Sequence, residues 1–147
     1  MAEDWPQRWR EYVEELGAVL SEGRRGDALE LFMRLAGSSD EDIAGARSSP
    51  FWPSGETLAH TLAYDAACLG DGQPPTARLA KITQQTLVAT GVDSRLPGAQ
   101  AWVLALDPAA DAIAASIPNA ERTTFEGQSH VADPEAVAPV LERFFSP

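Results

Sequence analysis

Only two segments of this chain have the sequence pattern of a buried β-strand, and both lie in its second half. Residues 86–90 form a short apolar run that ends at Gly91, and residues 121–125 alternate before Gly127. Each is followed by a segment with helical periodicity, so the pattern predicts strand–helix–strand–helix, the order of parallel β/α units. Because parallel strands are normally buried on both faces within a larger sheet, two strands alone make a poor sheet.

Two explanations are open for this shortage of strands. Either another copy of the chain or another polypeptide extends the sheet, or further strands have a pattern too weak to recognise. We favour the first explanation. It predicts a homodimer, or a partner chain that completes the sheet.

The first half, in contrast, shows no strand pattern and is predicted to be helical. Large apolar side chains recur there at three- and four-residue steps, and glycines follow the ends of the periodic stretches. Ser39 is a typical N-cap, since acidic residues fill the turn that follows it. The predicted helices cover about residues 5–22, 27–36, 40–47 and 55–69.

Pro74 and Pro75 mark the boundary between the two halves. We therefore expect a helical region over residues 1–72 and a β-α-β-α region over residues 73–147. Within the second region, residues 98–107 have no clear pattern. Pro108 leaves open whether the next helix is kinked there or begins there.

The composition excludes several classes of partner. A net charge of −11 argues against nucleic acid and acidic membrane surfaces, because phosphate neutralisation needs clustered Lys and Arg. No apolar run approaches the ~20 residues that cross a bilayer, and the N-terminus lacks a signal-peptide pattern. Cys68, the single cysteine, is expected to be a buried thiol in a reducing compartment, so we expect a cytoplasmic protein. With two His and one Cys we expect no metal site and no cofactor.

A histidine and an aspartate follow the two predicted strands. His130 lies just before a helix that begins Asp133-Pro134-Glu135, and Asp93 lies in the equivalent loop, about 37 residues earlier. Loops at the carboxyl ends of parallel strands are where open α/β sheets bind ligands. On neighbouring strands, a carboxylate orients an imidazole, which then takes a proton from a nucleophile. We predict His130 as the base and Asp93 as its partner, although ordinary loop hydrogen bonding also explains each residue.

Segments around these residues resemble the α/β-hydrolase family, especially its small actinobacterial members. Gln85–Val88 is similar to the strand before the acid-bearing loop, and Ala115–Ala120 to the Leu-Pro-Asn-Ala end of an Ala/Leu-rich helix. Glu126–His130 is similar to the family's Glu-Gly-Gln-x-His loop, and residues 57–65 to part of its helical cap. The resemblance covers nearly the whole chain. It implies a truncated α/β-hydrolase-like fold of a bacterial protein, with a helical cap followed by a β-α-β-α unit with few parallel strands.

One motif of that family is missing. The resemblance implies a Gly-x-Ser-x-Gly elbow before the cap, and no such string occurs in the chain. The nearest string, Gly127–Val131, lacks the final glycine and lies in the histidine loop instead. Ser129 is a poor substitute nucleophile, because neighbouring loop residues rarely hold the geometry that a base needs. The resemblance thus implies hydrolytic chemistry without its serine.

Several aromatic side chains and a second histidine are candidates for binding a substrate. Phe51 and Trp52 lie between prolines at a turn of the cap, where they line an apolar pocket or fill the cap's own core. Trp102 is open to the same two interpretations. His60 and Tyr64 lie one turn apart on a predicted helix, and a packed or surface histidine explains His60 as well.

These observations leave three hypotheses for the function. In the first, the chain acts on a small apolar substrate, such as an ester or a polyketide-like molecule, through proton transfer by His130. In the second, it is part of a true hydrolase whose nucleophile lies on another polypeptide. In the third, it is a non-enzymatic binding or assembly module, a pseudo-hydrolase homodimer. Whether the chain is an enzyme is therefore open at this point.

Overall fold

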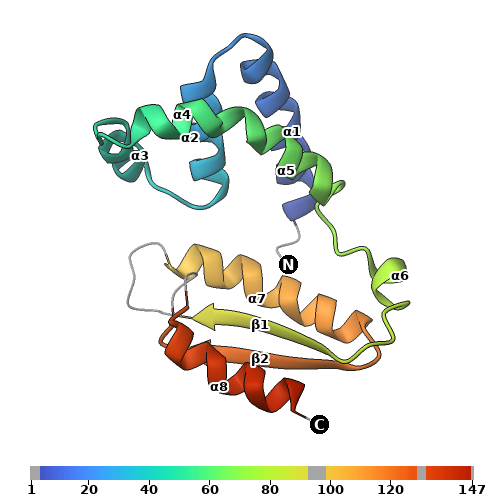
Figure 1. The fold of residues 1–147 in the computed structure, drawn as a ribbon. Coiled ribbons are helices and arrows are strands. Elements are labelled where there is room, and N and C mark those ends of the chain that lie inside the picture. The colour runs from blue at the N-terminus through green and yellow to red at the C-terminus, as the bar shows by residue number, and fades with distance from the viewer. Residues whose placement is uncertain (1–3, 93–98, 129–131, 147) are drawn as a thin grey trace. The chain divides into compact units, whose positions relative to one another are not determined.

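The chain forms two compact units, Ala2–Gln73 and Pro74–Pro147, termed the helical unit and the sheet unit. The structure is a computed structural model, and it describes residues 4–92, 99–128 and 132–146 (Figure 1). Among these residues, no helix has the length and the apolar composition needed to span a bilayer.

The helical unit confirms the helices predicted for the first half, with two differences at their starts. The second helix begins at Arg25, before the predicted start at Asp27. The last helical segment begins at Trp52, before the predicted Gly55, because Pro53 sits in the first turn, where a missing N–H costs nothing. The elements are α1 (Trp5–Ser21), α2 (Arg25–Leu35), α3 (Asp40–Arg47), α4 (Trp52–Leu58), a 3₁₀ turn (Ala59–Thr61) and α5 (Leu62–Leu69).

The core of the helical unit is built around one face of α1. Four of its side chains, spaced three or four residues apart, are buried: Trp9, Tyr12, Leu16 and Val19. Burying a side chain of this size contributes about 1.5–3 kcal/mol. Alanines of the other helices complete the cluster, and their small side chains let the helix backbones approach closely: Ala28, Ala59 and Ala66.

The predicted capping of two helices is confirmed. The Ser39 hydroxyl accepts a hydrogen bond from the Asp42 N–H at 3.2 Å, and the Asp42 carboxylate accepts one from the Ser39 N–H at 2.9 Å. This reciprocal pair is a capping box at the start of α3. The Asp133 carboxylate likewise accepts from the Glu135 N–H at 2.9 Å at the start of the last helix.

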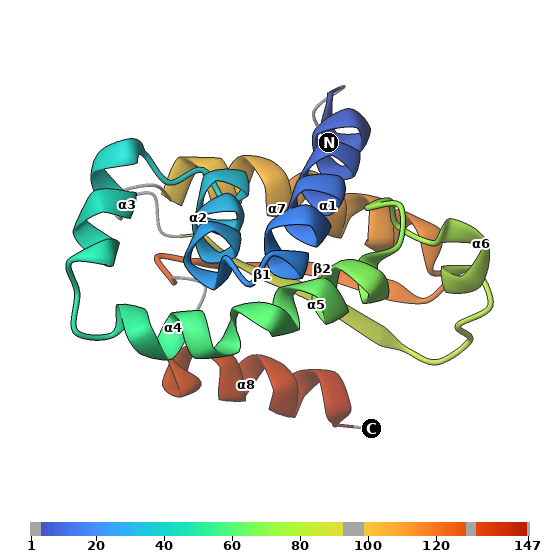
Figure 2. The ribbon, with the colours of Figure 1, turned by 90° about the horizontal axis from the view of Figure 1, so that it is seen from above.

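The sheet unit has the predicted strand–helix–strand–helix order. Its elements are α6 (Thr76–Leu79), β1 (Thr86–Val92), α7 (Ala99–Ser116), β2 (Ala120–Glu126) and α8 (Pro134–Phe145). The strands β1 and β2 are parallel and in register from Thr86↔Ala120 to Val92↔Glu126. The helices α7 and α8 lie on opposite sides of this pair of strands (Figure 1, Figure 2). The predicted pair of parallel strands is therefore confirmed.

The helix α7 continues through Pro108, which the sequence pattern left undecided. It runs without interruption from Ala99 to Ser116. A proline inside a helix removes one backbone hydrogen bond. Here α7 contacts both strands, and Asp107, the residue before the proline, bonds to a side chain of each strand, so tertiary contacts offset that loss.

The sheet unit buries little of its apolar surface. None of the strand residues 86–91 and 120–126 is buried, and among the described side chains of the unit only those of Ala110 in α7 and Ile117, the residue after α7, are buried. The helix α8 has no buried residue, although its apolar side chains form a continuous stripe. Parallel strands normally lie between two covered faces. The described part of the sheet unit is thus a β-α-β-α unit with an incomplete core.

Candidate functional site

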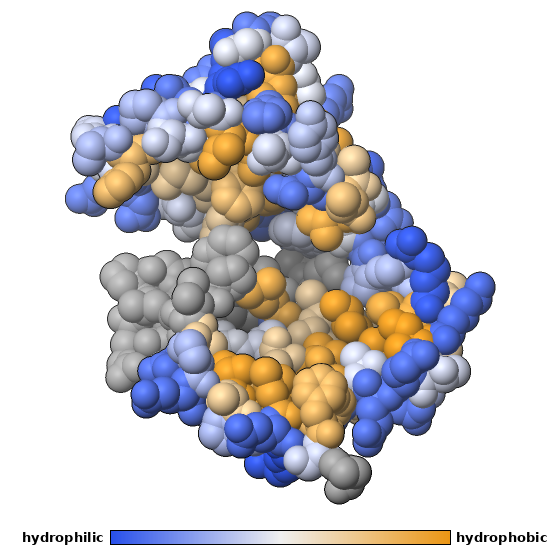
Figure 3. Space-filling view, in the orientation of Figure 1, coloured by the Kyte–Doolittle hydropathy of each residue, from blue (hydrophilic) through white to orange (hydrophobic). Residues whose placement is uncertain are grey.

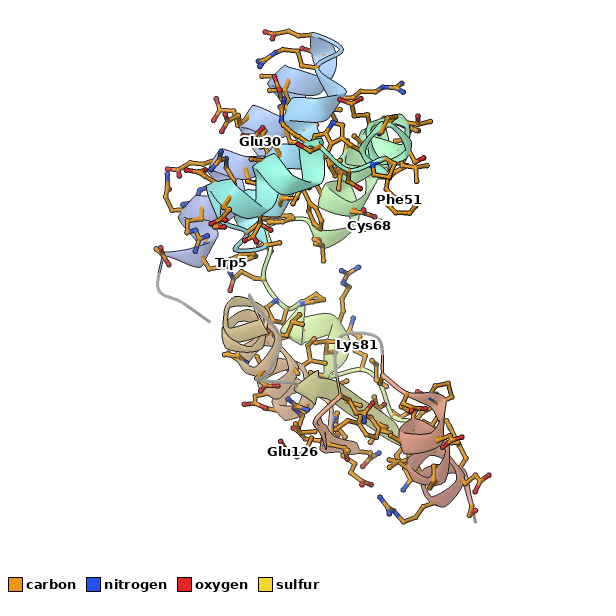
Figure 4. The ribbon with its side chains drawn as sticks, turned by 90° about the vertical axis from the view of Figure 1, so that its left-hand side faces the viewer. Trp5, Glu30, Phe51, Cys68, Lys81 and Glu126 are labelled. Atoms are coloured by element: carbon orange, nitrogen blue, oxygen red, sulfur yellow. The ribbon has the colours of Figure 1, made fainter. Side chains whose placement is uncertain are left out.

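The two strands end side by side at one edge of the sheet. Val92, the last residue of β1, pairs in register with Glu126, the last residue of β2 (Figure 4 labels Glu126). Asp93 follows Val92 in the sequence, and His130 follows Glu126 by four positions. Both predicted catalytic residues lie outside the described residues. Their pairing therefore stays a prediction, supported by the common edge at which the two strands end.

The residues on either side of the histidine segment are held together by a side chain that the sequence analysis did not single out. The Gln128 side-chain oxygen accepts a hydrogen bond from the Asp133 N–H at 2.9 Å. Gly127 turns the chain after β2 with a positive φ of 71°, a conformation that favours glycine. Gln128 therefore ties the start of the segment that contains His130 to the first turn of α8. Its position five residues before a helix N-cap is the sequence signal that points to this role.

A polar network joins both strands to α7 near the same edge. The Arg122 guanidinium of β2 donates to the Asp107 carboxylate at 2.7 Å, to the Thr90 hydroxyl at 2.8 Å and to the Asp111 carboxylate at 3.0 Å. The Thr90 hydroxyl of β1 in turn donates to Asp107 at 2.7 Å. The Arg122 side chain is 21% exposed, so solvent screens its ion pairs only partly. The network fixes the relative positions of β1, β2 and α7 two residues before β1 ends.

Two predicted substrate-binding residues lie in different environments at the start of α4. Phe51 is 79% exposed and extends away from the helices (Figure 4). Trp52 is half-buried, and the Arg47 guanidinium lies 5.4 Å from the centre of its ring, a cation–π contact within the helical unit. Phe51 is therefore available for contact with another molecule, whereas Trp52 already packs against α3.

The other predicted pair lies together on one helical surface. The rings of His60 and Tyr64 meet edge to face at 6.0 Å, and both residues are exposed. The His60 Nδ1 atom lies 3.1 Å from the Thr57 carbonyl oxygen. Trp102 belongs to α7, but its side chain lies outside the described part of the structure. The structure thus brings His60 and Tyr64 together, and both are accessible to a ligand.

Neither hollow found in the described residues has the size and lining of a pocket for an apolar substrate. The larger, about 290 Å³, is open and polar; its lining residues are Gly23, Arg25, Gly26, Pro53, Glu56 and Thr57. The apolar one is only about 60 Å³, against roughly 300–1,000 Å³ for typical ligand pockets. It is lined in part by Tyr12, whose pKa is raised to about 12 by burial and by the charge of Asp65. A substrate pocket therefore needs surface beyond these two hollows.

Two further features bear on cofactors and redox chemistry. Among the described residues, no group of three or more His, Cys, Asp or Glu side chains is placed to hold a metal ion. Cys68 is exposed, so the expectation of a buried thiol was wrong. The helix α5 is rich in apolar and small residues on all sides, and its pattern therefore does not tell which face is buried.

Comparisons with known proteins identify what this chain is similar to. No family model and no curated protein matches it. Among solved structures, the crystal structure of an alpha/beta hydrolase from Sphaerobacter thermophilus DSM 20745 is 42% identical in sequence, with a TM-score of 0.71. The match covers 92% of this chain and 50% of that chain, so this chain spans half the length of that hydrolase. The expected α/β-hydrolase-like fold, corresponding to part of such a protein, is confirmed.

Proposed function

We propose that this α/β-hydrolase-like chain acts on a small apolar substrate, such as an ester or a polyketide-like molecule, with His130 as the proton acceptor. The observation that carries the proposal is the 42% identity to an alpha/beta hydrolase over 92% of the chain. That range includes nearly all of both units. The common edge at which β1 and β2 end supports the pairing of His130 with Asp93.

In this proposal the chain supplies the acid and the base of a catalytic triad. The Asp93 carboxylate accepts a hydrogen bond from one imidazole nitrogen of His130, and the other nitrogen takes a proton from the reacting group. Gln128 supports this role, because its bond to the Asp133 N–H links the residue after β2 and its glycine turn to the N-cap of α8. The chain contains no Gly-x-Ser-x-Gly string, so a serine nucleophile of the usual kind is not among its own residues.

The helical unit is the proposed source of substrate contacts. Large apolar side chains are exposed from the start of α4 to the end of α5: Phe51, Leu58, Tyr64 and Leu69. His60 adds a polar group to the same helical segment, beside the Tyr64 ring. An apolar surface with one polar group suits a small ester, which has a single polar centre. We propose Phe51, Trp52, His60 and Tyr64 of this unit, and Trp102 of the sheet unit, as the residues that contact the substrate.

Turnover of p-nitrophenyl butyrate by the purified chain tests this proposal. Wild-type protein and three variants are compared: His130→Ala, Asp93→Asn, and His60→Ala as a matched histidine control. We expect His130→Ala to abolish any turnover and Asp93→Asn to reduce it strongly, since both act on the same proton transfer. His60→Ala is expected to raise KM with little effect on kcat. Turnover that persists unchanged in His130→Ala would rule out the proposed base.

The absence of a Gly-x-Ser-x-Gly string favours one alternative, a non-enzymatic small-molecule-binding or assembly module. Quenching of tryptophan fluorescence by an apolar ester, with no hydrolysis and with equal affinity in wild type and His130→Ala, would support it. A homodimer at micromolar concentration is expected for the assembly role.

The single cysteine in either case is compatible with a reducing compartment, and we propose a cytoplasmic location.

A further inference from the structure

We infer that the small apolar hollow of the helical unit binds a quaternary ammonium group, such as the trimethylammonium group of choline. The hollow is lined by residues of α1, α2 and α5, and α1 packs against both of the other helices (Figure 1). All of its lining residues belong to the helical unit. The inference goes beyond the proposed function and does not depend on the proposed base, His130.

Three aromatic side chains line the hollow. Trp9 and Tyr12 of α1 have ring centres 5.5 Å apart, and Phe32 of α2 completes the set. Aromatic rings attract a cation that lies within about 6 Å of the ring centre, and clusters of such rings recognise quaternary ammonium groups. A quaternary ammonium group suits this lining because its nitrogen carries methyl groups and has no N–H that needs an acceptor.

A carboxylate lies on the otherwise apolar face of α5. Leu62, Ala66 and Leu69 line the hollow at helical spacing, and Asp65 lines it with them. Burial and then the charge of Asp65 raise the pKa of Tyr12 to about 12, so the two groups are close enough to interact. Among the described residues, none forms an ion pair or a hydrogen bond with the Asp65 carboxylate. A negative charge without a partner on an apolar face favours a ligand that is both apolar and positively charged.

The volume of the hollow, about 60 Å³, fits one headgroup better than a whole substrate. A water molecule needs roughly 10–15 Å³ of such space, so the hollow holds roughly four to six groups of that size, enough for a nitrogen and its methyl groups. Phe32 is 36% exposed and Leu69 is 58% exposed, which leaves the hollow open on one side for the rest of a ligand. Figure 3 shows hydrophobic residues at the surface of the helical unit among hydrophilic ones.

The charge of the chain also favours a cation. The net charge of −11 attracts positively charged molecules and repels anions. Of the described residues that line the hollow, none is Lys or Arg. Because Asp65 is exposed, solvent and salt screen its charge. We therefore expect a dissociation constant on the order of 1–10 mM that rises with ionic strength.

Titration of the full chain with choline chloride, followed by NMR at constant ionic strength, tests the inference. We expect saturable shifts of the Trp9 indole N–H signal and of the backbone amides of Tyr12, Phe32 and Asp65. The neutral molecule 3,3-dimethyl-1-butanol has the shape of choline without its charge and serves as the matched ligand. It is expected to bind about fivefold more weakly, on the scale of a cation–π contact. No saturable shift at these residues, or equal affinity for the two ligands, would overturn the inference.

Phosphocholine, titrated in the same way, distinguishes two sources of the quaternary ammonium group. Weaker binding than that of choline supports a free cation, because the phosphate is repelled by the acidic chain. Equal binding supports a zwitterionic headgroup whose phosphate stays in solvent.

Two variants separate the charge from the aromatic lining. Asp65→Asn keeps the shape of the side chain, and choline affinity is expected to fall about fivefold while that of the neutral molecule stays the same. Glu14→Gln removes an exposed carboxylate of α1 that does not line the hollow and is the matched control. Phe32→Leu keeps an apolar side chain and is expected to weaken choline about threefold through the loss of one ring. Choline affinity that is unchanged in Asp65→Asn or in Phe32→Leu, in protein shown to be folded by circular dichroism, contradicts the inference; the comparison of the two ligands in wild type needs no variant.

Discussion

At the scale of single residues, two indole N–H groups hold the turn that ends the helical unit. The Trp9 N–H donates to the Gly70 carbonyl and the Trp5 N–H donates to the Gly72 carbonyl, both at 2.9 Å. The two rings stack at 5.9 Å, and Gly72 lies against Trp9 with a positive φ of 73°. A methyl group on Gly72 would lie 2.7 Å from the Trp9 ring. The turn therefore requires glycine for both its backbone conformation and its close approach to the ring.

Gly72→Ala is accordingly expected to lower the free energy of unfolding by about 1–3 kcal/mol, the cost of a strained backbone position and a steric clash. Gly17→Ala is the matched control, since a Cβ there meets nothing within 4 Å and the residue lies inside α1. A gain of about 0.5–1 kcal/mol is expected for it from helix propensity. Urea denaturation monitored by tryptophan fluorescence measures both. Similar effects of the two substitutions would contradict the packing of Trp9 on the turn.

At the scale of elements, ion pairs connect α2 to α3. The Glu30 carboxylate of α2 accepts hydrogen bonds from Arg34 of the same helix at 2.8 Å and from the Arg47 Nε–H of α3 at 3.1 Å. Its pKa is lowered from 4.5, chiefly by the hydrogen bond from Arg34; burial opposes this shift, and the smaller contribution of Arg47 adds to the lowering. Arg47 also pairs with Asp27 at 3.1 Å. The position of α3 on α2 thus depends in part on the ionised form of Glu30.

The ion pairs of Glu30 make the stability of the helical unit sensitive to acid. A carboxyl whose pKa is lower in the folded than in the unfolded state stabilises the fold above its unfolded pKa, here about 4.5. That contribution is lost as the pH falls through the lower folded-state pKa. Between pH 5 and pH 3 the urea midpoint is expected to fall less in Glu30→Gln than in wild type. Identical pH dependence of the two proteins would show that the ion pair carries no such linkage.

In the sheet unit, the ion pair between Arg122 of β2 and Asp107 of α7 likewise connects two elements. Arg122→Met keeps much of the side-chain volume but leaves the Asp107 carboxylate without its cationic partner, with only the hydrogen bond from Thr90 remaining. A loss of about 1–3 kcal/mol is expected, less than for a fully buried pair because Asp107 is 32% exposed. Arg143→Met, an exposed arginine on α8, is the control and is expected to change stability by less than about 0.5 kcal/mol. Thermal denaturation followed by circular dichroism distinguishes the two, and equal losses would contradict a structural role of the network.

The sequence predicted these elements better than it predicted their contacts. The apolar run at 86–90 and the alternation at 121–125 were sufficient to locate both strands, and Asp133-Pro134-Glu135 located the start of α8. Pro108 hid the true length of α7, because its contacts with both strands are not visible in the local pattern. Arg122 was missed for the same reason, since its partners lie on another strand and on α7. Asp93 and His130, the predicted catalytic residues, stay predictions.

At the scale of the whole molecule, the central feature is that the two described strands bury little of their surface. The helical unit has a buried core of aromatic and aliphatic side chains, whereas none of the strand residues 86–91 and 120–126 of the sheet unit is buried. The chain also matches only half of an alpha/beta hydrolase. Both findings are compatible with the proposed function, in which Asp93 and His130 are the acid and the base of a hydrolase-like site.

The measurement that tests this account most directly is turnover of p-nitrophenyl butyrate by the wild-type chain and by His130→Ala, measured side by side. The account predicts turnover in wild type that His130→Ala loses, because the base that takes the proton of the reacting group is removed. Equal turnover by the two proteins, or none by either, would contradict the account.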